Sequence, residues 1–72
     1  MIKVGSEVGW TWGYGIAVGK VIYIHPYRHE IITKGKLIVR NGSINDPAVV
    51  IEQSNGTLVL KLQHEIKNLR EN

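Results

Sequence analysis

Residues 5–21 read GSEVGWTWGYGIAVGKV and contain both tryptophans, one of the three tyrosines and five of the eight glycines of the 72-residue chain. Residues 7–12 alternate between large apolar and small or polar side chains, which is the period of a half-buried strand. Gly13-Tyr14-Gly15 interrupts the alternation with residues that favour a tight turn. Residues 16–25, rich in Ile, Val and Tyr, are expected to form a second strand. Gly19 within it predicts a bulge or a close approach of another backbone.

Turn-forming residues divide the rest of the chain into further strands. We expect strands at 29–34 and 36–40 around a Lys34-Gly35-Lys36 tip, and at 48–53 and 57–61 around Asn55-Gly56. Asn-Gly predicts a type I′ turn, which needs positive φ at both central residues. Residues 41–47 are crowded with Asn, Gly, Asp and Pro and are expected to form a loop.

The C-terminal part has a different pattern. Leu62, Ile66 and Leu69 recur at helical spacing, so we expect one or two helical turns that place all three over an open barrel end. Together the elements predict an all-β fold, a small barrel of five to six short strands with a short C-terminal helical turn. Closing the sheet removes exposed edges.

Length and composition limit the classes of protein that fit. Seventy-two residues are expected to form a single domain, residues 1–72, with one compact core. The absence of cysteine excludes disulfides and fits a reducing cytoplasm. Apolar runs such as Val21–Ile24 are far shorter than a membrane span, so we expect a cytoplasmic protein with no membrane partner.

Basic residues are concentrated in the middle of the chain. Of a net charge of +3, residues 20–40 contribute +4, with a single acidic residue, and the remainder contributes −1. The candidate nucleic-acid-binding residues are Lys20, Arg28, Lys34, Lys36 and Arg40. A positive field favours anionic partners, and a two-stranded ribbon is narrow enough for a major groove. The alternative is a hairpin decorated with charge for solubility and to block edge pairing.

Aromatic residues offer a second candidate surface. Trp10 is expected to join the core, whereas Trp12, Tyr14 and Tyr27 lie beside turns and are expected to be exposed. Such a surface can stack bases or hold a peptide, including a methylated one through cation–π attraction. The alternative is that these rings cover a small core with their polar tips in water. A structural role as a homo-oligomer subunit also remains open.

Four pieces of the sequence, in order, resemble a known family. They are Gly5-Ser6-x-Val8-x-Trp10 with Ala17-x-Gly19-Lys20-Val21; Lys34-Gly35-Lys36; Asn41-Gly42-Ser43-x-x-Asp46-Pro47-Ala48; and Ile51-Glu52-x-x-x-Gly56-x-x-Val59-x-Lys61. The chain is similar over about residues 3–67 to the hypervirulence-associated protein Tudor-domain family of small bacterial and fungal proteins. The resemblance implies an SH3-like barrel but no settled activity. Ser6 replaces a frequent Asp, and Val49 replaces a frequent aromatic residue that could wall an aromatic cage.

Signals for catalysis or metal binding are weak. No nucleophile–base pair or phosphate-binding glycine loop is visible in the sequence. His25-x-x-x-His29 has ligand spacing only on a helix, and Pro26 interrupts it. We therefore expect a non-catalytic binding module with no cofactor and no metal, whose first candidate partner is nucleic acid and whose second is a protein or peptide.

Overall fold

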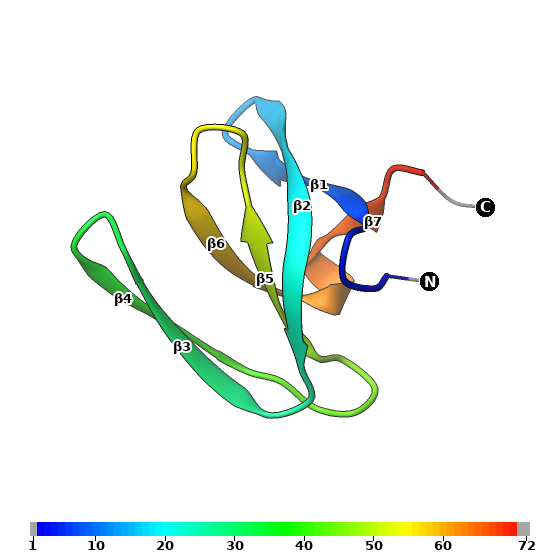
Figure 1. Ribbon diagram of the computed structural model, residues 1–72, viewed down its shortest axis with the longest axis vertical. Coiled ribbons are helices and arrows are strands. Elements are labelled where there is room, and N and C mark those ends of the chain that lie inside the picture. The colour runs from blue at the N-terminus through cyan, green and yellow to red at the C-terminus, as the bar shows by residue number, and fades with distance from the viewer. Residues whose placement is uncertain (1, 71–72) are drawn as a thin grey trace.

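Residues 2–70, which the computed structural model describes, form seven strands and one turn of 3-10 helix (Figure 1). The elements are β1 (Glu7–Trp12), β2 (Gly15–His25), β3 (Arg28–Thr33), β4 (Lys36–Asn41), β5 (Ala48–Glu52), β6 (Leu58–Leu62), η1 (Gln63–Glu65) and β7 (Lys67–Asn68). Alternating apolar residues form the strands, and glycines with positive φ stand in four of the turns, at Gly5, Gly13, Gly35 and Gly56.

The main sheet is antiparallel, with strand order β6-β5-β2-β1-β7. Its last strand follows the 3-10 turn and returns to pair with β1, which is the SH3-like (Tudor-like) topology that the sequence predicts. The β3–β4 hairpin, here called the ribbon, is inserted between β2 and β5 and forms a sheet of its own. The expected loss of sheet edges is wrong, because among the described residues β6 and β7 remain edge strands.

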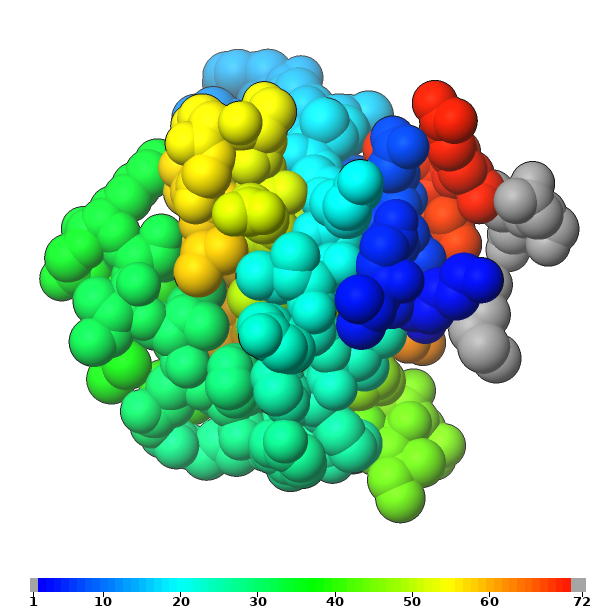
Figure 2. Space-filling view, in the orientation of Figure 1, coloured from blue at the N-terminus to red at the C-terminus, as the bar shows by residue number. Residues whose placement is uncertain are grey.

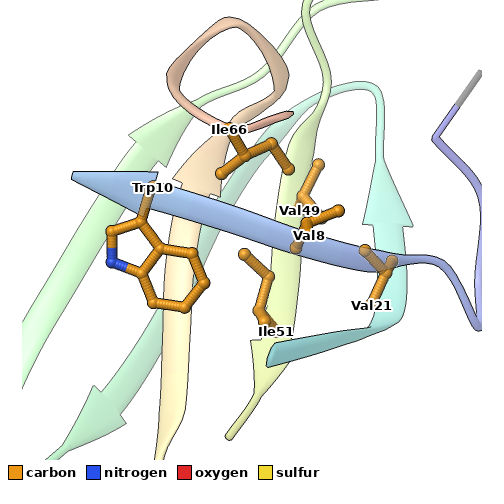
Figure 3. Packing of buried hydrophobic residues seen from close by; sticks show 6 residues of the cluster. All are labelled: Val8, Trp10, Val21, Val49, Ile51 and Ile66. Atoms are coloured by element: carbon orange, nitrogen blue, oxygen red, sulfur yellow. The ribbon is translucent and has the colours of Figure 1, made fainter. Parts of the chain in front are cut away.

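The core consists of two apolar clusters on the two faces of β5. The first contains Val8, Trp10, Val21, Val49, Ile51 and Ile66, which Figure 3 shows gathered around β1. The second contains Ala48, Val50 and Leu60, and the ribbon covers it with Ile31 and Ile38. Because both faces of β5 are covered, four consecutive residues, Ala48 to Ile51, are buried. This explains why β5 reads as an unbroken apolar run.

The C-terminal helical turn is present, but the prediction that Leu62, Ile66 and Leu69 share one apolar face is wrong. Leu62 ends β6 and packs against the second cluster, while Ile66 is buried in the first. Leu69 follows β7 and is 49% exposed, close to Gly9 on the outer face of the sheet. The three residues therefore belong to three environments, because the helix is one 3-10 turn and extended chain flanks it.

The type I′ signature occurs at the other hairpin. Lys34 and Gly35 have φ values of 52° and 75° and form a two-residue turn between the paired residues Thr33 and Lys36. At Asn55-Gly56 only the glycine has positive φ, within a longer connection from β5 to β6. The type I′ prediction at Asn55-Gly56 is therefore wrong, and the Asn55 side chain instead accepts a hydrogen bond from the Thr57 N–H at 2.9 Å.

Candidate functional site

An open groove of about 460 Å³ lies between the ribbon and the β6 edge of the main sheet. Trp10, Trp12 and Ala17 line one wall; Thr33, Lys34, Ile38 and Arg40 line the wall on the ribbon; and Gln53, Asn55 and residues 57–61 complete it. Figure 2 shows the tip of the ribbon, in green, standing apart from the yellow loop between β5 and β6. Residues from both faces of β6 line the groove, so the edge of this strand faces the groove.

Strand register determines which side of the ribbon faces the groove. Ile31 pairs with Ile38, and both pack on the second cluster, which defines the inner face. Thr33 pairs with Lys36 and therefore lies on the same face. Ile32 pairs with Leu37 on the outer face, where their side chains are 75% and 59% exposed. The outer face of the ribbon is thus apolar near its tip, whereas Glu30 and Val39 form the middle pair of that face.

Trp12 stands at the mouth of the groove. It shares a face of β1 with Trp10, whose ring is buried in the first cluster. β1 ends at Trp12, beyond the last core layer, and its indole is 74% exposed. The first strand therefore places Trp10 in the core and Trp12 in solvent, as the sequence predicted for each.

The side chains that line the groove carry only positive charge. Lys34, Arg40 and Lys61 are among them, and no carboxylate is found among those lining residues in the described chain. The Arg40 Nε donates to Glu65 Oε1 at 3.2 Å, and Glu65 also accepts from the Leu62 N–H at 2.7 Å. Partial burial raises the pKa of Glu65, but the bonds from Leu62 and Arg40 and the nearby charges of Arg40 and Lys61 outweigh it and hold the pKa below its ordinary value. Arg40 is thus a structural cation in direct contact with Glu65, whereas Lys61 acts on Glu65 only through its charge, and Lys34 is exposed at the tip.

The base of the ribbon is held by backbone and side-chain contacts. Gly42 donates its N–H to the Tyr27 carbonyl oxygen at 3.2 Å, which closes the ribbon below its last strand pair. Asp46 accepts the His64 backbone N–H at 2.9 Å and contacts the His64 Nδ1 at 2.6 Å. These two bonds from His64 lower the pKa of Asp46. The loop after β4 is thereby fixed to η1.

The other predicted basic residues lie in different surroundings. Arg28 forms an ion pair with Glu30 on the outer face of the ribbon. Lys36 is exposed on the inner face at the tip, outside the groove lining.

Lys20 is placed between two carboxylates. The sheet register sets it directly opposite Glu7 on one side and Glu52 on the other, over a separate hollow of about 580 Å³. Directly opposed residues have Cβ atoms about 4.5–5.5 Å apart, so these carboxylates offset its charge. Lys20 is therefore not part of the groove.

The predicted aromatic residues do not form one surface. Trp12 and Tyr14 lie at the start of β2, and Tyr27 follows its end. A strand rises about 3.3 Å per residue, so the ends of this 11-residue strand lie on the order of 30 Å apart along the chain. The three rings therefore cannot close around one methylated cation.

A second aromatic cluster lies at the corner between β2 and β3. The His25 ring stacks on His29 with centroids 3.9 Å apart and on Tyr23 at 5.8 Å, and its Nδ1 lies 3.0 Å from the Tyr27 hydroxyl. Burial, and then the neighbouring His29, lower the pKa of His25. The alternation of Tyr23, His25 and Tyr27 in the sequence is a signal for this cluster, but the cluster was not predicted. Within residues 2–70 no group of three or more metal-ligating side chains is found.

The fold and the groove define a small β-barrel binding domain. Residues 5–66 match the family described as the Tudor domain of hypervirulence-associated proteins, and the chain therefore belongs to this family. Searches among curated proteins and among solved structures found no significant match. Tudor domains are in general non-catalytic modules that bind proteins or nucleic acids. Across the described residues there is no helix whose length and apolar character would suit a membrane crossing.

Proposed function

We propose that this domain binds nucleic acid weakly and with little sequence preference, through the groove and the tip of the ribbon. The observation that carries the proposal is the groove lining, which combines Lys34 and Lys61 with exposed Trp12 and, among residues 2–70, contains no carboxylate. A phosphate backbone satisfies such a lining, because each neutralised phosphate releases counterions and adds affinity. Lys36 extends the positive surface beyond the groove.

The same charges argue against a methylated lysine or arginine in this groove. A methylated ammonium or guanidinium remains cationic, so Lys34 and Lys61 repel it. Cation–π recognition uses aromatic faces around the cation. Trp12 is the exposed aromatic residue that lines the groove.

The test compares two double variants of equal net charge. Lys34→Asn with Lys61→Gln removes the two available groove lysines, whereas Lys3→Asn with Lys67→Gln removes two exposed lysines outside the groove. Affinity for a fluorescently labelled mixed-sequence oligonucleotide is measured by polarisation over a salt series. We expect the groove variant to lower the slope of log affinity against log salt by about 2, roughly one per phosphate contact, and the control to leave it nearly unchanged. Equal losses in both variants, or no binding by the parent protein at low salt, would contradict the proposal.

A second candidate function is the capture of an extended acidic peptide. The observation that favours it is the β6 edge, whose residues 58–61 line the groove. A peptide can add to such an edge through main-chain hydrogen bonds. Protection of β6 amides from hydrogen exchange upon addition of a poly-glutamate peptide would favour this function over nucleic-acid binding.

A further inference from the structure

The geometry points to single-stranded nucleic acid as the ligand of the groove, with one base stacked on the Trp12 indole and the adjoining phosphates beside Lys34 and Lys61. This inference rests on the proposed function and specifies its ligand class. It depends on the two faces of the ribbon and on the position of Trp12.

The outer face of the ribbon is poorly suited to a duplex. A ribbon that enters a major groove reads base edges through polar side chains and needs cations beside the phosphates. Here exposed Ile32 and Leu37 occupy the tip end of that face, and Arg28 is paired with Glu30. The ribbon therefore lacks the side chains that it would need to read a major groove.

The groove beside the inner face of the ribbon offers the groups that binding of a single strand requires. Proteins that bind single strands combine a positive groove with an aromatic ring on which bases stack. Lys34 and Lys61 provide the charge, and Trp12 provides a ring whose faces are not covered by the core. Gln53, Asn55 and Thr57 add polar groups along the same groove.

The size of the groove excludes a duplex from the same position. The groove has a volume of about 460 Å³, within the range of roughly 300–1,000 Å³ that is typical of small-molecule sites. This volume suits a base and its phosphate, whereas a double helix is far too large to enter. A single strand can, because its bases turn out individually.

The experiment measures the affinity of a labelled mixed-sequence 12-nucleotide strand and of its duplex at low salt. The proteins are the parent chain, Trp12→Ala, Trp12→Phe and Tyr14→Ala. Tyr14 is a matched aromatic control, because it is exposed beside the same turn but does not line the groove. Substitution of exposed Trp12 leaves the core intact, which circular dichroism checks.

We expect the parent to prefer the single strand by about tenfold or more. Trp12→Ala should weaken single-strand binding by about 5- to 150-fold, the range for one stacked base, Trp12→Phe should restore part of it, and Tyr14→Ala should have no effect. Equal or tighter duplex binding, or an unchanged Trp12→Ala affinity, would overturn this inference and leave the proposed function standing. Failure of both ligands to bind would remove the proposed function itself.

Discussion

Gly42 is the position where the addition of one methyl group should damage the fold most clearly. A Cβ built there lies 2.5 Å from the Ala48 nitrogen and 2.7 Å from the carbonyl oxygens of both His25 and Tyr27. All three are backbone atoms, so no side chain can turn aside. Ordinary contact begins near 3.4 Å, and the corner must therefore open by about 0.7–0.9 Å on three sides.

Overpacking of this kind costs roughly 1–3 kcal/mol, and we expect Gly42→Ala to fall at the upper end, at about 2–3 kcal/mol. Total stability for 72 residues is about 4–11 kcal/mol, so the loss is a large fraction of it. The Tm should fall by roughly 8–24 °C, at about 4–8 °C per kcal/mol for a domain of this size.

Gly15→Ala is the matched control. Gly15 has no atom within 4 Å of a built Cβ, and its φ is not in the left-handed region. We expect it to be unchanged or stabilised by up to ~1 kcal/mol, because alanine restricts the unfolded chain. Urea unfolding of both variants gives the comparison. A loss below about 0.5 kcal/mol for Gly42→Ala would refute the reasoning, since it would mean that the corner can move freely.

Three further predictions concern the turn, the ion pair and pH. Lys34→Asn should stabilise the protein by roughly 0.5 kcal/mol in urea unfolding, because Asn tolerates the positive φ of a type I′ turn better than Lys does. Arg40→Ala should cost about 1 kcal/mol in the same assay, since it removes a partly buried pair with Glu65, and Glu65→Ala should cost at least as much because it also frees the Leu62 N–H. As the pH falls below about 6.5, His25 takes up a proton in the unfolded chain before it does so in the folded protein, where its pKa is lowered. The free energy of unfolding should therefore decrease as the pH falls through this range. His25→Gln should reduce this dependence of stability on pH when urea midpoints are measured from pH 7.5 to 5.

The sequence predicted the strands well because their side-chain pattern is local. The alternation in residues 7–12, the apolar run of β5 and the turn glycines each depend on a few neighbouring residues. Gly19 was expected to mark a bulge or a close approach of another backbone, and the second holds: an added Cβ would lie 2.9 Å from the Glu52 carbonyl oxygen. The irregular register lies further on, between Val21 and Tyr23.

Long-range packing accounts for what the sequence could not predict. Leu62, Ile66 and Leu69 have helical spacing by coincidence, because β6, η1 and β7 lie on different parts of the barrel. The charge pattern identified Lys34 and Arg40 as candidates. It could not reveal that Arg40 is paired with Glu65, which follows it by 25 residues. Lys61 was not a candidate, because only the tertiary fold brings it beside Lys34.

The ribbon has two roles, one in its middle and one at its tip. Ile31 and Ile38 cover the second cluster, and without them Val50 and Leu60 would face water. The tip, with Lys34 and Lys36, packs on neither core cluster and forms the cationic end. Because stability depends on the Ile31–Ile38 pair and charge lies at the tip, substitutions at the tip should change binding while leaving the fold intact. Substitutions at Ile31 or Ile38 should affect both, since a displaced ribbon also displaces one wall of the groove.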